Sequence, residues 1–535
     1  MPNRNLRFIF HPSSFILFQV MTATFAKFKA HFLNWREWEL NPIVIKELRQ
    51  AVRSWAVTGM LLLFLTVLFI VSIVFLVSQS FDVHTNMQLG ASLFSTFVVI
   101  LAGASIIFIP LYIGIRVAME RRDNNPDLLY VSTLSPARIV FGKFLCGAYM
   151  ALLFFSACMP FMAFTNLLRG VDLPTVFYIL FFLFLAVCAA NQIAIFLACL
   201  PMSLPFKVLL ALVGVFASFM IIGSLIAASF AMMISGTGAM MMHGNFWVGV
   251  FTYVGIGLAL TGLLFVLSVA LISPPSANRA LPVRLYVTVI WLLGGLLNFA
   301  WIWQMKEPQL ILVWAVATSV LMFFSLLVVI SNADQIGPRV RRTIPWPRWK
   351  RAAAFLFFNG AAGGLLWIVL ICAITYFAAS GIISLGVVWF PKTAYGMSTE
   401  QSDSFFTNSF TAAAYALAYA LTALFIQRKF FPHRPPKLAG LLAVLLAAAV
   451  AIVPSIVLFF LNRLSWNSVE GVQLGNVFNI FALRTNDQLW PHQIFAVCWL
   501  ILITLVNAKW FLRQMKNFHP PVSAPPVIAE ISPLP

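Results

Sequence analysis

Twelve apolar stretches of about 20 residues dominate this sequence, and each is long enough to cross the roughly 30 Å hydrocarbon layer of a membrane as a helix. Of the 535 residues, 61% are apolar and only 9% are charged. Soluble domains have about 45–50% apolar residues. The sequence therefore predicts an all-α polytopic membrane protein with about twelve transmembrane helices. The predicted spans are residues 56–79, 89–115, 144–168, 175–200, 208–234, 247–272, 285–303, 310–331, 352–377, 406–426, 438–461 and 493–512.

The positions of Lys and Arg predict the orientation of these spans, because basic loops are retained on the cytoplasmic side. With both termini in the cytoplasm, alternate loops place 29 of the 34 Lys and Arg residues on that side. The net charge of +19 is then explained by membrane topology. No nucleic-acid partner is needed to account for it.

The predicted spans contain few side chains that could bind a coupling ion. All fifteen Asp and Glu residues are predicted in loops, tails or interfaces, and the seven histidines near span ends or in loops. Ion-coupled carriers keep ionisable groups inside the bilayer, so this distribution argues against that class. Sodium-coupled carriers that bind the ion through backbone carbonyls remain an alternative. The polar residues predicted inside spans are Asn191, Gln192, Asn298 and Asn359. They are expected to form interhelical hydrogen bonds, and contact with a substrate is the alternative.

No motif for catalysis or cofactor binding is found. The six cysteines lie in apolar runs without Cys-x-x-Cys spacing, which predicts neither disulfides nor a metal site. A phosphate-binding loop requires Gly-Lys followed by Ser or Thr, but Gly142-Lys143 is followed by Phe144. We predict no cofactor and no enzyme activity for the chain. If ATP drives it, a separate polypeptide hydrolyses the ATP.

A basic segment before the first span is predicted to form an amphipathic helix. Asn41 is the expected cap and Pro42 the first helical residue. The apolar face consists of Val44, Leu48, Val52 and Trp55, and the polar face of Lys46, Arg49 and Arg53. This pattern is typical of an elbow helix in the headgroup layer. The alternative is a basic flank that only orients the first span.

The connection between the second and third spans is predicted to contain a helix of about two turns, with Asn125 as cap and Asp127 at its positive end. Ser135-Pro136 ends it and starts the next helix. Its apolar surface consists of Leu128, Leu129 and Leu134. An exposed apolar patch usually marks a partner. The alternative is a helix that packs against its own membrane domain.

Together, these two segments resemble the permease subunits of ABC type-2 exporters. Members of that family read Asn-Pro-x-x-x-Lys-Glu-x-Arg before the first span and Glu-x-x-x-Gly-Thr-x-Glu-Leu-Leu-x-x-Thr-Pro-x-Ser, then Gly-Lys, before the third. The matching residues are Asn41, Pro42, Lys46, Glu47, Arg49, Glu120, Asp127, Leu128, Leu129, Ser135, Gly142 and Lys143. Asn124-Asn125 replaces Gly-Thr and Ser132-Thr133 replaces Thr-Pro. The resemblance covers about residues 30–275.

The resemblance implies a permease subunit of a bacterial inner-membrane transporter, an exporter, that is energised by a separate ABC ATPase subunit. Residues 125–134 would be the coupling helix that binds the ATPase. The implied ATPase-coupling residues are Glu120, Asp127, Leu128, Leu129 and Leu134, and the implied elbow-helix residues are Asn41, Pro42, Lys46, Glu47, Arg49 and Arg53. Membrane lipid and either a homodimer mate or a second permease subunit would be the other partners. A twelve-helix secondary transporter and a non-transporting membrane scaffold or assembly factor are the alternative functions.

The predicted organisation has four parts. Residues 1–40 form a cytoplasmic N-terminal segment, in which Met21 is an alternative start. Residues 41–275 form the permease-like domain, and residues 285–512 form a second six-helix region without motifs of that family. This second region is either a divergent permease half or an accessory bundle. Residues 513–535 form a Pro-rich, disordered cytoplasmic tail.

Overall fold

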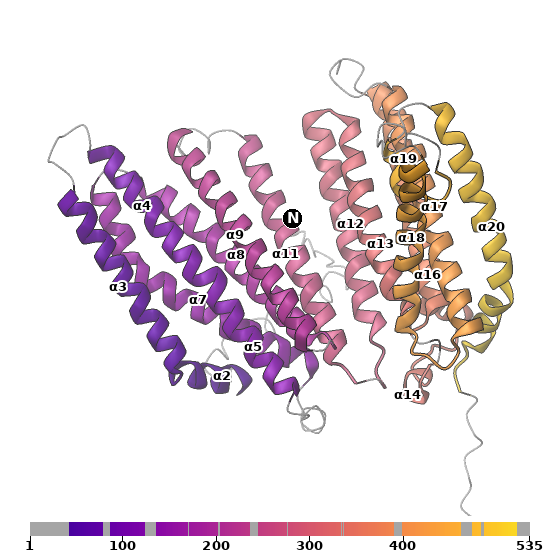
Figure 1. The fold of residues 1–535 in the computed structure, drawn as a ribbon, viewed down its shortest axis with the longest axis horizontal. Coiled ribbons are helices and arrows are strands. Elements are labelled where there is room, and N and C mark those ends of the chain that lie inside the picture. The colour runs from indigo at the N-terminus through magenta and orange to yellow at the C-terminus, as the bar shows by residue number, and fades with distance from the viewer. Residues whose placement is uncertain are drawn as a thin grey trace, which may run out of the picture. The chain divides into compact units, whose positions relative to one another are not determined.

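A computed structural model describes residues 42–78, 86–122, 135–168, 171–201, 204–235, 244–274, 276–332, 334, 336–389, 399–461, 473–482 and 486–521. The described residues form helices and short connections, without a strand among them (Figure 1). Twelve of these helical segments are long and apolar enough to cross a membrane. The prediction of an all-α, multi-pass membrane protein is thereby confirmed. The chain forms two compact units, unit 1 (Met1–Met242) and unit 2 (His243–Pro535).

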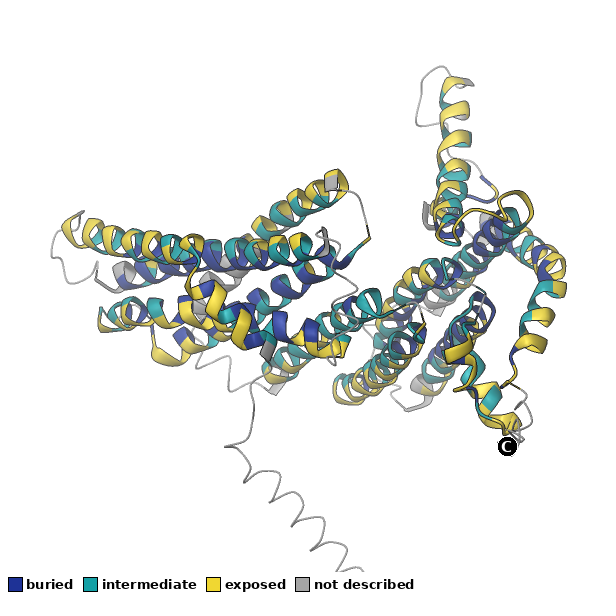
Figure 2. Cartoon of the chain, turned by 90° about the horizontal axis from the view of Figure 1, so that it is seen from below, coloured by how far each residue is buried: buried dark blue, intermediate teal, exposed yellow. Residues whose placement is uncertain are grey.

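Unit 1 begins with a short amphipathic helix and continues with long apolar helices. Its elements are α2 (Pro42–Val52), α3 (Trp55–Ser78), α4 (Asn86–Gly103), a π-helical turn η2 (Ala104–Phe108), α5 (Ile109–Arg122), α7 (Pro136–Leu167), α8 (Leu173–Cys199) and α9 (Leu204–Ser235). Helix α7 packs against α3, α4, α5 and α8. The rings of Phe64 and Phe154 lie 5.4 Å apart between α3 and α7. Buried residues follow the sides of the helices that face one another (Figure 2).

The second span departs from regular α-helix near its only proline. Pro110 has no backbone N–H, and its ring opposes the carbonyl four residues earlier, so an α-helix cannot continue through it unchanged. The preceding residues Ala104–Phe108 accommodate this by forming a π-helical turn. The irregularity therefore takes the form of a local widening of the helix next to Pro110.

The described residues of unit 2 form seven long helices and several short ones. Its elements are α11 (Gly244–Ile272), α12 (Ala280–Met305), η3 (Pro308–Leu310), α13 (Ile311–Ile330), α14 (Pro338–Arg341), α15 (Arg348–Phe357), α16 (Ala361–Trp389), α17 (Thr399–Phe430), α18 (Lys437–Leu461), α19 (Val477–Ala482) and α20 (Asn486–Asn517). Helix α11 packs against α12 within this unit. The division at residues 275–285, which rests on the family resemblance, stays a prediction.

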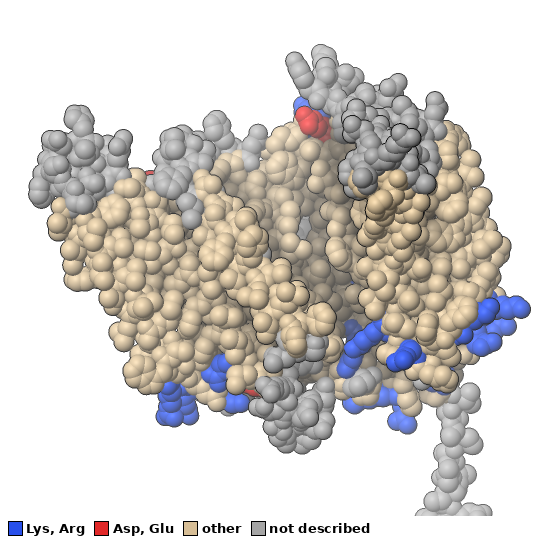
Figure 3. Space-filling view, in the orientation of Figure 1, with Lys and Arg blue, Asp and Glu red and all other residues tan. Residues whose placement is uncertain are grey.

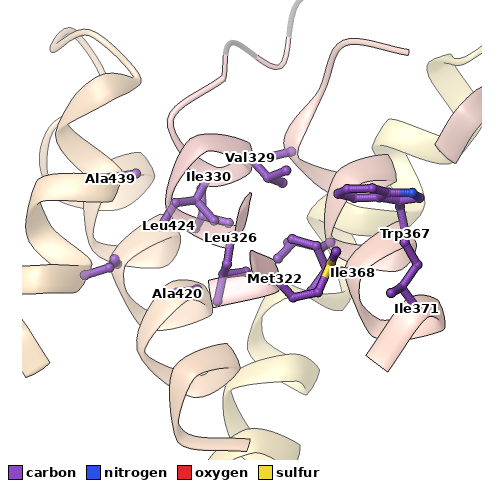
Figure 4. Close-up of a cluster of buried hydrophobic side chains, with 14 of the residues drawn as sticks. Met322, Leu326, Val329, Ile330, Trp367, Ile368, Ile371, Ala420, Leu424 and Ala439 are labelled. Carbon is purple, nitrogen blue, oxygen red and sulfur yellow. The ribbon is translucent and has the colours of Figure 1, made fainter. Parts of the chain in front are cut away.

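The core of unit 2 lies between α13, α16, α17 and α18 (Figure 4). Met322 and Leu326 of α13 meet Ile368 of α16, while Ala420 of α17 and Ala439 of α18 allow the helix backbones to approach closely. Small residues at helix interfaces are a common packing device in membranes. This packing gives unit 2 a hydrophobic core of its own.

The predicted ninth span, residues 352–377, is wrong in its position. The structure ends α15 at Phe357 and begins the membrane-spanning α16 at Ala361. Gly360, between the two helices, has a φ of 134°, which residues with a Cβ rarely adopt. Asn359 therefore lies in this break and not inside a span. It accepts a hydrogen bond from the backbone N–H of Ala280 at 2.9 Å and donates to the carbonyl of Ala277 at 3.2 Å.

Basic side chains lie mainly at one end of each bundle. In unit 1 they lie near α2, and in unit 2 near α14 (Figure 3). Between the ends of the helices, the visible surface is a band without charged atoms. Such a band matches the hydrocarbon layer of a membrane, with the cations in the headgroup region.

Candidate functional site

A cluster of charged side chains, centred on a buried ion pair, joins three helices at the α2 end of unit 1. Nζ of Lys143 in α7 lies 3.0 Å from Oε1 of Glu47 in α2 and 2.6 Å from Oε2 of Glu120 in α5. The side chains of Lys143 and Glu47 are 8% and 4% exposed, and that of Glu120 is 38% exposed. We call these residues, together with Arg116 of α5, the charged cluster.

Arg116 adds a second link between α2 and α5. Its Nε lies 3.9 Å from Oε2 of Glu47, and its Nη1 donates to the hydroxyl of Tyr112 at 2.8 Å. The guanidinium also donates to Oε1 of Gln50 in α2. The cluster thus contains two carboxylates and two cations, so its charges balance. Balance matters because an unpaired charge in a low-dielectric site is strongly unfavourable.

The sequence of α2 explains how Glu47 reaches this site. Positions 44, 47 and 51 lie on one side of a helix, and Val44, Glu47 and Ala51 are all buried. Lys46, Arg49 and Arg53 are exposed, as expected for the polar face. The helix is described from Pro42 onward. Asn41, its expected cap, lies outside the described residues.

The predicted apolar face of α2 is partly wrong. Helix α2 ends at Val52, which is 70% exposed, and Trp55 belongs to the next helix, α3, where it is 89% exposed. The buried face is centred on Val44 and Ala51 because Glu47, between them, points to Lys143. A face assigned by hydropathy alone omits such a residue, since a carboxylate is buried only where a cation meets it.

The cluster lies at the base of the connection that sequence analysis predicts to be the coupling segment. Helix α5 ends at Arg122, two residues after Glu120, and α7 begins at Pro136, two turns before Lys143. Helix α7 begins at Pro136, as predicted, and Ser135 caps it, with its hydroxyl accepting from the N–H of Arg138 at 3.4 Å. The predicted coupling residues Asp127, Leu128, Leu129 and Leu134 lie outside the described residues.

Asn191 of α8 fixes the contact between α7 and α8. Its amide donates to the carbonyl of Phe144 in α7 at 3.2 Å, which confirms the interhelical hydrogen bond predicted for this residue. A Cβ added to Gly147 would overlap the side-chain amide of Asn191. The glycine therefore gives Asn191 the space to reach α7, one turn from Lys143.

Changing Gly147→Ala should consequently destabilise unit 1 by about 1–3 kcal/mol, the usual cost of overpacking. Gly59→Ala in α3 is a matched control, because its Cβ would meet nothing within 4 Å. In a helix, that control should be neutral or slightly stabilising. Thermal unfolding of the purified variants in detergent tests the difference. Equal midpoints for the two variants would contradict the packing role of Gly147.

Three ionisable side chains are buried near the ends of spans, and two of them, Lys143 and Arg284, contradict the prediction that the spans lack such groups. Lys143, Arg284 and His492 are buried within described spans. Each lies within about two turns of a helix end, so the middle of the bilayer still lacks them. Lys143 and Arg284 were expected on the cytoplasmic side, just before their spans, and the structure instead includes both in the helices.

Arg284 has no acidic partner among the described residues but is held by backbone carbonyls. It is 2% exposed, and its guanidinium donates to the carbonyls of Leu356 at 2.7 Å, Phe358 at 2.8 Å and Gly360 at 3.0 Å. These carbonyls lie at the C-terminal end of α15, where the helix dipole favours a positive charge. Arg284 therefore stabilises the break between α15 and α16.

His492 belongs to a polar network at the opposite end of unit 2. The backbone N–H of Gln473 donates to the side chain of Asn479 at 3.1 Å, which identifies the accepting atom as the amide oxygen Oδ1. An amide oxygen can only accept, so Nε2 of His492, 3.0 Å away, is the donor in their hydrogen bond. Nδ1 of His492 is then left to accept from the hydroxyl of Tyr415 at 3.1 Å. These contacts hold α17 and α20 to the segment that contains α19. Both recorded partners of the His492 ring, Tyr415 and Asn479, are thus neutral polar side chains.

The described residues contain no group of three or more His, Cys, Asp or Glu side chains that could hold a metal ion. The six cysteines are free thiols. Among the described residues, all three ion pairs belong to the charged cluster. Sequence analysis selected Glu47, Glu120 and Lys143 through separate motif matches. Sequence analysis did not select Arg116. The only signal for this residue was its position as a cation next to an apolar stretch.

No family model, no curated protein and no solved structure matches this chain.

Proposed function

We propose that the chain is the membrane-spanning permease subunit of an ATP-driven ABC transporter, an exporter, whose ATP is hydrolysed by a separate subunit. The observation that carries this proposal is the contact of Lys143 with both Glu47 and Glu120. These residues match the two motifs of the resemblance, which lie more than 70 positions apart in the sequence. Because these residues form one cluster, both motifs contribute to the same contact between α2, α5 and α7.

The cluster offers a route for mechanical coupling. In the proposal, residues 125–134 form the coupling helix and bind the ATPase. Movement of the ATPase is then transmitted directly to the ends of α5 and α7. Lys143 then ties Glu47, and with it α2, to both helix ends. Separating a buried ion pair is costly, so the three helix ends move as one body. Rigid movement of this kind is a common way to rearrange a membrane domain.

The proposal also includes the topology and the partners. The basic ends of the bundles face the cytoplasm of a bacterial cell, and α2 lies as the elbow helix in the inner leaflet of the inner membrane. Leu128 and Leu129 bind a cleft of the ATPase subunit, and Asp127 lies at the positive end of the coupling helix. A second copy of the chain or a second permease subunit completes the transporter.

The double change Leu128→Asp and Leu129→Asp tests this function, because two carboxylates in an apolar docking surface should abolish ATPase binding. The same change at Val527 and Ile528 in the C-terminal tail is a matched control. Tagged variants are purified gently from the native host, and co-purifying proteins are identified by mass spectrometry. We expect a stoichiometric ATPase with a phosphate-binding loop in the control and the wild type only. Retention by the Leu128/Leu129 variant would refute docking at this segment.

A further inference from the structure

A second basic surface lies in unit 2 and plays no part in the proposed coupling. Helices α14 and α15 pack against the end of α20, and we call this assembly the basic platform. Its exposed cations are Arg339, Arg341, Arg342, Arg348, Lys350, Lys509, Arg513 and Lys516. None of the ion pairs between described residues involves them. Between Asp334 and Glu400 the sequence contains no acidic residue.

The helices of the platform pack around a small hydrophobic core of their own. Val340, Ile344, Phe358 and Phe518 are buried together. The ring of Phe518 lies 5.3 Å from that of Phe355 and 5.5 Å from that of Phe358. Nη1 of Arg351 lies 3.0 Å from Nδ1 of His519, which joins α15 to the residues after α20. The segments that carry the exposed cations are therefore packed together, and no described acidic residue forms an ion pair with these cations.

The position of the platform relative to the spans of unit 2 indicates that it lies at the membrane surface. Helix α15 leads through three residues into the membrane-spanning α16. Arg284, near the start of the membrane-spanning α12, binds the carbonyls at the end of α15. The platform is thus connected to the two spans α12 and α16 near the first residues of both. That level is the boundary between hydrocarbon and headgroups.

Two tryptophans on the platform favour lipid over a soluble acidic partner. Trp346 is 65% exposed and Trp349 is 72% exposed. The ammonium group of Lys350 lies 5.2 Å from the ring of Trp349. Tryptophan is enriched at membrane interfaces, where its ring meets the acyl chains and its N–H meets the headgroups. On the platform, cations alternate with tryptophans next to two spans. This surface is suited to bind a lipid headgroup that carries a phosphate.

We propose that the basic platform binds the headgroups of anionic phospholipids, with Arg339, Arg342 and Arg348 as the principal phosphate contacts. These three arginines are exposed, and their side chains form no hydrogen bond with another described residue. Each basic residue near an anionic membrane surface contributes about fivefold in affinity. The lipid anchors unit 2 at the membrane surface. This role holds whether or not the chain has an ATPase partner.

The test compares lipid binding by the full chain and two variants in dodecyl maltoside, measured by native mass spectrometry. The probes are dioleoyl phosphatidylglycerol and dioleoyl phosphatidylcholine, which differ only in the headgroup. The platform variant carries Arg339→Gln, Arg342→Gln and Arg348→Gln. The control carries Lys306→Gln, Lys392→Gln and Arg484→Gln, which remove the same charge from connections predicted on the opposite side of the membrane.

We expect the wild type and the control variant to bind phosphatidylglycerol more tightly than phosphatidylcholine, and the platform variant to lose about tenfold or more of its phosphatidylglycerol affinity. The binding should weaken in high salt. Equal affinity of the wild type for the two lipids would overturn the proposal. So would an unchanged phosphatidylglycerol affinity of the platform variant, or displacement of the lipid by soluble polyglutamate, which would identify an acidic protein partner instead. Matching thermal midpoints of the two variants show that both are folded.

Discussion

Lys143→Met should destabilise unit 1 by about 3 kcal/mol or more, because breaking a buried ion pair leaves an uncompensated charge. In the charged cluster, the loss of Lys143 leaves Glu47 and Glu120 with Arg116 as the remaining nearby cation. Glu47 is almost fully buried and cannot reach water without moving α2. We therefore expect a large decrease in the thermal unfolding midpoint, and α2 should detach before the rest of unit 1 unfolds.

The measurement uses the free cysteines of the chain. Cys146 and Cys158 in α7 and Cys199 in α8 are buried, so a thiol-reactive dye reports the opening of these helices in detergent. Lys46→Met is the control, because it removes a lysine from the exposed face of α2. Its midpoint should stay near that of the wild type. Equal midpoints for the two variants would contradict a structural role of the cluster.

A second substitution separates the loss of the ion pair from the loss of a lysine. Adding Glu47→Gln to Lys143→Met removes the buried negative charge that the single variant leaves behind. The double variant should therefore be more stable than Lys143→Met alone. Strict additivity of the two effects would indicate that Glu47 and Lys143 do not interact.

Arg284→Met should loosen the break between α15 and α16. Three backbone carbonyls lose a charged donor at once, and each hydrogen bond to a charged group contributes about 1.5–3 kcal/mol. The site is buried, so water cannot easily replace the guanidinium. We expect α15 to detach from α12 and the connection between α15 and α16 to become accessible, while the core between α13, α16, α17 and α18 persists.

Limited digestion with trypsin measures this opening, since α15 carries cleavage sites at Arg348, Lys350 and Arg351. Cleavage there should be several-fold faster in Arg284→Met than in the wild type. The control Arg342→Met removes an exposed arginine of the same surface and leaves those three sites intact. A cleavage rate of Arg284→Met equal to that of the control would show that Arg284 does not hold α15.

Much of the fold could be predicted from the sequence because membrane spans are local features. A run of about 20 apolar residues is visible without knowledge of its neighbours, and the twelve predicted spans correspond to the twelve in the structure. The ninth span was misplaced because the apolar run at residues 352–358 continues the run of α16. The break between them depends on Gly360 and on Arg284, a residue 76 positions away from Gly360.

The candidate site could be predicted only in part. Helix α2 and its polar face follow from local spacing and the position of Pro42. The contact between Lys143 and Glu47 joins residues 96 positions apart, and no periodicity within either segment indicates it. Lys143 and Arg284 were both interpreted as loop cations because a charge near a span end is normally solvated. Their burial depends on partners that come from other helices.

The central claim is that residues 125–134 bind an ATPase, and photo-crosslinking in living cells tests it most directly. A photoreactive amino acid replaces Leu128 in one variant and Val527 in the control, and the adducts formed under ultraviolet light are identified by mass spectrometry. The account predicts an adduct with a protein that contains a phosphate-binding loop at Leu128 and none at Val527. A folded, membrane-inserted Leu128 variant that forms no adduct with such a protein would contradict it and would favour a secondary carrier or a membrane scaffold.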